Sequence, residues 1–294
     1  MKIVFMGTSS FGLECLQKLI AMKQDISAIY TLPSVINISW SKNPIHLATH
    51  KNFTRIAHTN SIPIIEVKEK IKYYAQSIKS FSPNFILAAG WYYIIPKDIL
   101  RIPDLGCGGI HASLLPRYRG GAPLSWAIIN GERQTGVSLF YFAGGVDTGD
   151  IIGQKKISIT ERDTIQTVYK KAAKTALRLI EKYIPLIEQK KAPRIKQNDK
   201  LATFFPSRIP EDGIINWNKT SVEIYNWIRA QTKPYPGAFF YTPEKKKIIV
   251  WASKVPVKKK IRSAPPGAII YKDSKRIDVA TSDYYISITH YDTI

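Results

Sequence analysis

The sequence has few cysteines and about half as many acidic residues as basic ones. Cys15 and Cys107 are its two cysteines, too few for a disulfide framework and too far apart for a Cys-x-x-Cys metal site. We therefore expect a reducing, cytoplasmic setting and no metal. The 43 Lys and Arg against 22 Asp and Glu give a net charge of +21. That charge suits nucleic acid, phosphorylated substrates or simply a basic surface.

Long apolar runs are also lacking. The longest apolar stretch, 85–95, is interrupted by Gly90 and is well short of the roughly 18 residues that a membrane span needs. The apolar start of the chain stops at Gly7, so we expect neither a signal peptide nor membrane insertion. No Lys-Ser/Thr follows Gly7–Gly12 and no third glycine completes a dinucleotide fingerprint, which favours a plain tight turn.

Two histidines have the spacing of a metal-binding helix. His46 and His50 would share one face of a weak helix, but Leu47 stands where a metalloprotease helix carries its Glu. No Cys or carboxylate lies nearby in the sequence, so we interpret both as surface histidines.

The apolar pattern predicts an α/β fold followed by a small β-rich domain. Strands alternate with helices in the first part, as in a doubly wound, mostly parallel sheet. We predict strands at 3–6, 26–31, 62–67, 85–89, 108–111 and 135–141, and helices at 70–78 and 164–189. We place the first domain at 1–190, a linker at 191–203 and a second domain at 204–294. The second has a helix at 221–231 and short strands at 248–252, 268–271, 277–280 and 284–289, a pattern typical of a small open, OB-like β-barrel.

Polar and Gly-rich turns gather between residues 106 and 150. His111 and Asp147 lie at the ends of neighbouring predicted strands, and a carboxylate beside an imidazole can handle protons, although a purely structural pair is as common. Asp150 is the competing carboxylate. Arg117 and Arg119 form either a diphosphate clamp or part of a solvated loop.

Motifs in this stretch resemble those of the 10-formyltetrahydrofolate-dependent formyltransferases. They are His-Ala-Ser-Leu-Leu-Pro-Arg-Tyr-Arg-Gly-Gly-Ala-Pro at 111–123, Thr-Gly-Val at 135–137 and Val-Asp-Thr-Gly-Asp at 146–150. The resemblance extends over nearly the whole chain and implies a Rossmann-like domain that transfers a formyl group from the folate to an amine. It implies catalytic roles for His111, Asp147 and position 109. It also implies a folate site at Ala88, Ala89, Gly90, Trp91, Tyr92, Leu115, Gly145 and Val146, and substrate contacts by Ser113, Arg117 and Arg119.

One position departs from the family pattern. The family has Asn-x-His where this chain has Gly109-Ile110-His111, and the Asn donates a hydrogen bond to the formyl oxygen. Losing such a donor typically costs about 10² to 10³ in rate. A backbone N–H or a water could substitute, the enzyme could be weak or only bind its ligands, or this copy of the sequence could carry a change. We expect Gly109→Asn to raise turnover.

The acceptor amine is the second open question. Methionyl-tRNA formyltransferases resemble both domains, yet their basic, Gly-rich loop after the second strand is replaced here by 33–44, with one Lys and no Arg or Gly. The segments 208–213 and 233–239 resemble enzymes that formylate nucleotide-linked amino sugars in lipopolysaccharide building. We favour a nucleotide sugar over tRNA as the partner, and leave a homodimer open.

Overall fold

The computed structural model describes residues 1–38, 41, 43–255 and 264–294. Trp40 of the predicted loop and the basic cluster at 258–260 lie outside the described residues. The described chain forms two compact units. The first comprises residues 1–123, 135–157 and 170–207, and the second comprises 124–134, 158–169 and 208–294.

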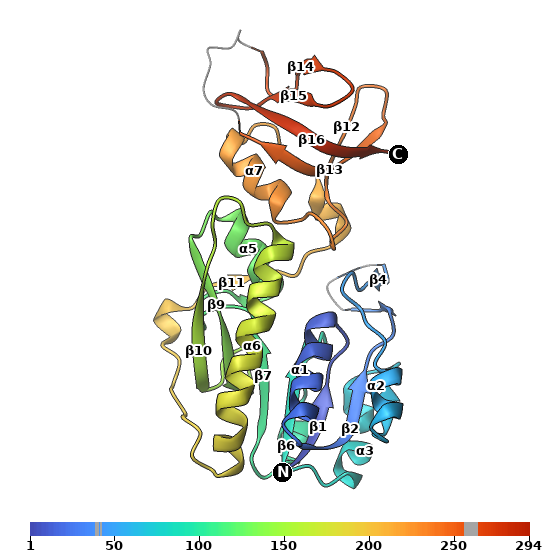
Figure 1. Ribbon diagram of the computed structural model, residues 1–294, viewed down its shortest axis with the longest axis vertical. Helices are drawn as coiled ribbons and strands as arrows, with labels where there is room; N and C mark the ends of the chain where they lie inside the picture. Colours follow the sequence, from blue (N-terminus) through green and yellow to red (C-terminus); the bar gives the residue numbers. More distant parts are fainter. Residues whose placement is uncertain (39–40, 42, 256–263) are drawn as a thin grey trace. The chain divides into compact units, whose positions relative to one another are not determined.

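A seven-stranded sheet forms the centre of the first unit (Figure 1). Its strands are β1 (Lys2–Met6), β2 (Asp25–Thr31), β5 (Ile64–Glu66), β6 (Phe85–Ala89), β7 (Cys107–His111), β9 (Gln134–Tyr141) and β10 (Ile151–Ser158). The order is β10-β9-β7-β6-β1-β2-β5; β5, β2, β1, β6 and β7 are parallel, and β9 runs antiparallel to β7. The predicted mostly parallel sheet is confirmed.

Helices α1 (Ser10–Ala21) and α6 (Ile165–Glu188) run beside each other along the strands (Figure 1). Lys18 of α1 forms a 2.9 Å ion pair with Glu181 of α6. Leu16 and Leu19 of α1 are buried, as their helical spacing predicts. Shorter elements complete the unit: α2 (Thr54–Thr59), η1 (Ile71–Tyr74), α3 (Ala75–Ser80), α4 (Lys97–Leu100), β3 (Val35–Ile36), β4 (Ile45–His46), β8 (Arg119–Gly120), η2 (Asp199–Leu201) and β11 (Phe204–Phe205).

The turn after β1 packs against the end of β6. A Cβ on Gly7 would lie 2.7 Å from the Ala89 carbonyl oxygen, and one on Gly12 would meet the same atom. The two glycines therefore allow the turn after β1 and the first turn of α1 to approach the end of β6 closely, in agreement with the tight turn expected from the sequence.

The predicted helix across His46 and His50 is wrong. His46 belongs to the two-residue strand β4, and His50 pairs in an isolated bridge with Ser9. Burial alternates from residue 45 to residue 49, which is the period of extended chain rather than of a helix. His50 is half-buried, with Nε2 3.1 Å from the Leu32 carbonyl oxygen.

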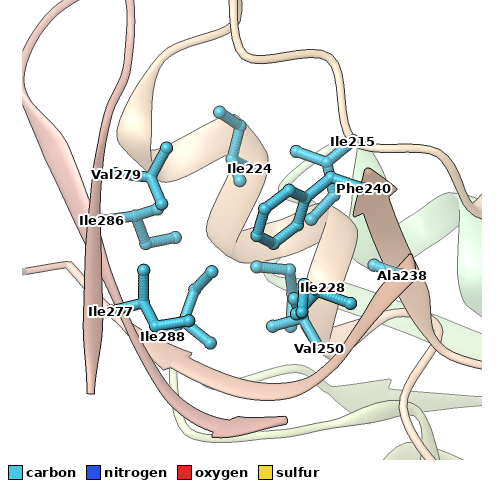
Figure 2. Packing of buried hydrophobic residues seen from close by; sticks show 11 residues of the cluster. Ile215, Ile224, Ile228, Ala238, Phe240, Val250, Ile277, Val279, Ile286 and Ile288 are labelled. Carbon is cyan, nitrogen blue, oxygen red and sulfur yellow. The ribbon is translucent and has the colours of Figure 1, made fainter. Parts of the chain in front are cut away.

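The second unit contains a five-stranded antiparallel sheet in the order β12-β13-β16-β15-β14. Its strands are β12 (Ala238–Tyr241), β13 (Lys247–Lys254), β14 (Ile269–Lys272), β15 (Ile277–Ala280) and β16 (Tyr285–Thr293). Helices α5 (Pro123–Ile129), α7 (Ser221–Arg229) and η3 (Pro210–Gly213) accompany them. Ile224 and Ile228 of α7 face the apolar side of the sheet (Figure 2).

Arg208 has a packing role in this second unit. Its guanidinium carbon lies 5.0 Å from the Trp126 ring centroid and 4.5 Å from that of Trp227. Nη2 donates to the Asp212 carbonyl at 3.0 Å and to Oε1 of Gln231 at 2.7 Å. Burial lowers the pKa of this guanidinium, which stays charged at neutral pH.

Candidate functional site

His111 and Asp147 are close together in the structure. His111 is the last residue of β7, and its Nδ1 lies 3.6 Å from Oδ2 of Asp147. The side chains are 11% and 18% exposed. The separation is slightly longer than a hydrogen bond.

Backbone groups hold both members of the pair. Nε2 of His111 lies 2.7 Å from the Tyr118 carbonyl oxygen, and because a carbonyl only accepts, Nε2 carries the proton. The Gly120 N–H donates to Oδ2 of Asp147 at 2.9 Å. The remaining ring nitrogen of His111, Nδ1, therefore faces the carboxylate of Asp147.

The strand directions alone do not explain this meeting. Since β9 is antiparallel to β7, Tyr141 at its end lies opposite Gly108 near the start of β7. The turn after β9 brings Asp147 back to His111. Asp147 itself has φ +53°, in the left-handed region that few non-glycine residues adopt.

Gly109 lies in the middle of β7, opposite Ala88 on β6 and Phe140 on β9. Its backbone groups face ladder partners on both sides, which makes its N–H a poor donor to a substrate. Neither Gly108 nor Gly109 has a positive φ, so the backbone is ordinary there. The space above Gly109 is filled: a Cβ would lie 2.5 Å from Cε1 of Phe142 and closer to its Cζ.

The predicted folate residues lie on the ends of β6 and on two turns. Ala88, Ala89 and Leu115 are buried. Gly90 has φ +63° and leaves no room for a Cβ against Ser9. Tyr92 is 38% exposed and Val146 is 49% exposed, whereas Trp91 is half-buried and its ring forms a T-shaped pair with that of Tyr93. Gly145 lies on the exposed turn before Val146.

The predicted substrate residues differ in their surroundings. Ser113 is buried, and its hydroxyl donates to the Arg117 carbonyl at 2.7 Å. Arg117 is exposed. The Arg119 side chain is only 3% exposed and bonds to Gln197 and Asp199. These internal bonds give Arg119 a structural role, and we do not assign it to a phosphate.

The glycines beside these arginines also have a structural reason. A Cβ on Gly120 would meet the Phe205 carbonyl oxygen, and one on Gly121 would meet Ser207. The two glycines beside the arginines therefore allow the chain at 204–207 to pack closely.

The sequence did not point to Gln197, Phe142 or the Tyr118 carbonyl as parts of the site. Gln197 lies in the stretch we predicted as a linker and carries no motif, and a backbone carbonyl leaves no sequence signal. Cys107, also in β7, supplies no nucleophile, because burial raises the pKa of its thiol to about 12. No group of three or more metal-ligating side chains occurs among the described residues.

A mostly parallel α/β sheet, a His–Asp pair at the end of β7 and in the turn after β9, and an antiparallel β-domain make this a two-unit α/β protein. The family described as formyl transferase matches residues 1–184, and its C-terminal domain matches residues 208–293. The chain belongs to the formyltransferase family, and it is a formyltransferase.

Relatives carry different names. A methionyl-tRNA formyltransferase of Pelotomaculum thermopropionicum is 36% identical over 290 residues, 98% of this chain and 90% of the relative. The bifunctional polymyxin resistance protein ArnA of Wigglesworthia glossinidia brevipalpis is 43% identical over 178 residues, 60% of this chain and 27% of its own length. The structure of an N-formyltransferase from Helicobacter canadensis matches with TM-score 0.69 and 19% identity, covering 99% of this chain and 100% of its own. That last likeness shows the fold.

No helix in the part of the chain that the structure describes is long and apolar enough to cross a membrane.

Proposed function

We propose that this enzyme transfers the formyl group of 10-formyltetrahydrofolate to the amine of a nucleotide-linked amino sugar, a precursor of lipopolysaccharide or another surface glycan. The observation that carries the proposal is the His111–Asp147 pair, with Nδ1 3.6 Å from Oδ2. Family membership supports the formyl chemistry, and the pair supplies the proton handling that amine acylation needs.

The reaction exchanges one C–N bond for another. The acceptor nitrogen attacks the formyl carbon, the formyl oxygen becomes an oxyanion, and the bond to N10 of the folate then breaks. The proton lost by the acceptor amine ends on N10. In our proposal Asp147 and His111 take this proton and return it, because the two side chains lie side by side within the protein.

Two turns support a folate site next to this pair. Ala88, Ala89, Gly90, Trp91 and Tyr92 would line one side of the pterin, and Leu115, Gly145 and Val146 the other. The exposed apolar surfaces of Tyr92 and Val146 are the kind that a flat ring covers. Gly90, between Ala89 and Trp91, has a positive φ and packs against Ser9.

Our preference for a sugar acceptor over a tRNA rests first on the sequence of the loop between β2 and β4. Residues 33–44 hold one Lys and no Arg, which offers little to the phosphates of a tRNA. The Helicobacter canadensis structure is described as a complex with folinic acid and dTDP-3-aminofucose, in accord with a sugar acceptor. Arg117, exposed after the Ser113 turn, is the side chain we assign to the diphosphate.

A methionyl-tRNA formyltransferase is the second candidate. The observation in its favour is the 36% identity to an enzyme of that name over 98% of this chain. The net charge of +21 also suits tRNA.

The test is formyl transfer to a panel of amino-sugar nucleotides, with charged initiator tRNA beside them and mass spectrometry as the readout. We expect one sugar nucleotide to be formylated, and Asp147→Asn to lower kcat by about 10² or more while folate binding persists, because the amide keeps the shape but not the charge. Near-normal turnover of Asp147→Asn across neutral pH would remove Asp147 from the mechanism. Folate binding without transfer to any acceptor would identify a binding protein that has lost catalysis.

A further inference from the structure

The segment 195–205 is built into the first unit, although its polar sequence predicted a linker. Ile195 and Ile151 exchange two backbone hydrogen bonds of 2.8 and 3.0 Å. Further along, β11 pairs in parallel with β8, so Phe204 lies opposite Arg119 and Phe205 opposite Gly120. The segment therefore runs along β8, whose Gly120 contacts Asp147, and along the start of β10, which follows the Asp147 turn.

Gln197 contacts the turn of Asp147 directly. Its Nε2 donates to the carbonyl oxygen of Asp147 at 2.7 Å and to that of Gly149 at 2.7 Å. Its Oε1 accepts from Nε of Arg119 at 3.1 Å and from Nη2 at 2.8 Å. Both donors and both acceptor positions of the amide are occupied.

Arg119 fixes which way this amide points. With the amide reversed, the two N–H groups would face a guanidinium that has only donors. The guanidinium is itself held, since Nη2 also donates to Oδ1 of Asp199 at 2.6 Å. Arg119 thus orients Gln197, and Gln197 binds the backbone of the Asp147 turn.

The Asp147 turn requires such support. A non-glycine residue at φ +53° costs free energy and persists when its surroundings hold it. Gln197 donates to the carbonyls of residues 147 and 149, and the Gly120 N–H donates to Oδ2 of Asp147. Together these bonds set the direction of the carboxylate toward His111.

We propose that Gln197 is a positioning residue for catalysis: it holds Asp147 in the orientation in which its carboxylate meets His111, and Arg119 fixes Gln197. The catalytic consequence rests on the proposed function, because it requires the His111–Asp147 pair to move the proton. The effect of Gln197 on the orientation of the Asp147 carboxylate does not depend on that function.

The test compares Gln197→Glu with Asn198→Asp. Both convert an amide to a carboxylate and add the same charge, one residue apart. Glu at 197 keeps its partner Arg119 but presents no donors to the two carbonyls, whereas Asn198 is exposed and its Oδ1 accepts from the Lys200 N–H, which an Asp can equally do. We expect Gln197→Glu to lower kcat by about 10-fold to 10²-fold with little change in KM for donor and acceptor, and Asn198→Asp to match the wild type.

A second readout needs no acceptor. The Gly120 amide donates to Oδ2 of Asp147, so its hydrogen exchange reports whether the carboxylate keeps its place. We expect faster exchange at Gly120 in Gln197→Glu and unchanged exchange in Asn198→Asp. Unchanged Gly120 exchange in a folded Gln197→Glu protein would overturn the proposal, even if the wild type formylates nothing in the panel; absent transfer by the wild type would count against the proposed function alone.

Arg119→Lys provides the second variant, in case Gln197→Glu does not fold. Lys cannot donate two parallel bonds to Oε1, so it should lower kcat and expose the Gly120 amide in the same way. A raised KM for the sugar nucleotide with unchanged kcat would instead mean that Arg119 binds the diphosphate, and would contradict its role in orienting Gln197.

Discussion

At the scale of single residues, Gly109 and Phe142 have to be considered together. The sequence shows only that an expected Asn is missing, and suggests that restoring it would restore a donor. In the structure the Phe142 ring occupies the volume where that side chain would begin. The centroid of the Phe142 ring lies 5.3 Å from that of Phe140, and the ring also packs against Leu115 and Ile151. Displacing it would therefore lose packing contacts.

The expected result for Gly109→Asn therefore changes. Alone, it should lower the melting temperature and leave turnover unchanged or lower, because Asn and the ring compete for one volume. Combined with Phe142→Ala, it should raise kcat by up to about 10²-fold over Phe142→Ala alone, with KM little changed, since the restored donor acts chiefly on the transition state. Melting curves and steady-state kinetics of the two single variants and the double variant measure this coupling. Effects that simply add would show that the two positions are independent.

At the scale of elements, strongly periodic segments were predictable. The helix predicted at 164–189 is α6 at Ile165–Glu188, and the strand predicted at 85–89 is β6. Helix α6 buries an apolar stripe at helical spacing, and β6 is a short apolar run that is buried at every position.

Elements that depend on tertiary contacts were missed. β10 has exposed residues at 154–156 and no clear alternation, and β12 follows directly on a turn rich in Pro and Gly. The site was predictable to the same extent: His111 and Asp147 carry a motif, whereas Gln197 and Phe142 act through contacts between distant segments.

Residues 220–223 form a capping box at the N-terminus of helix α7, and its strength depends on pH. The Thr220 side chain accepts from the Glu223 N–H, and Glu223 accepts from the Thr220 N–H at 2.9 Å and from its hydroxyl at 2.8 Å. These bonds from Thr220, with Lys219 alongside, lower the pKa of Glu223 from 4.5 to about 2.

A carboxylate with a lowered pKa in the folded state stabilises the fold above its unfolded pKa, and this stabilisation is lost as the pH falls from about 4.5 toward 2. Gln at 223 cannot titrate. We expect Glu223→Gln to be less stable than the wild type at pH 6 by about 0.5–1 kcal/mol, the usual size of an exposed cap, and this difference to vanish near pH 2. Denaturant unfolding at several pH values measures it, with Glu211→Gln as a control for the loss of an exposed carboxylate. A stability difference between Glu223→Gln and the wild type that stays constant down to pH 2 would contradict the lowered pKa of Glu223.

At the scale of the whole molecule, the net charge of +21 suits either of two acceptors, and the binding of these acceptors should depend differently on salt. A tRNA substrate that neutralises six or more phosphates would lose on the order of 10³ in affinity between 50 and 200 mM salt. A sugar nucleotide brings one diphosphate, so its binding should change far less. The charge itself does not distinguish these cases, because it is spread over both units.

The most direct test of the acceptor is a competition in one reaction. Labelled 10-formyltetrahydrofolate is mixed with the enzyme, the amino-sugar nucleotides and charged initiator tRNA at equal concentrations, first at 50 mM salt and then at 200 mM, with His111→Ala as the blank. We predict that the label enters a sugar nucleotide at both salt concentrations and that His111→Ala transfers almost none. Label on the methionine of the tRNA, falling steeply at the higher salt, would contradict the account.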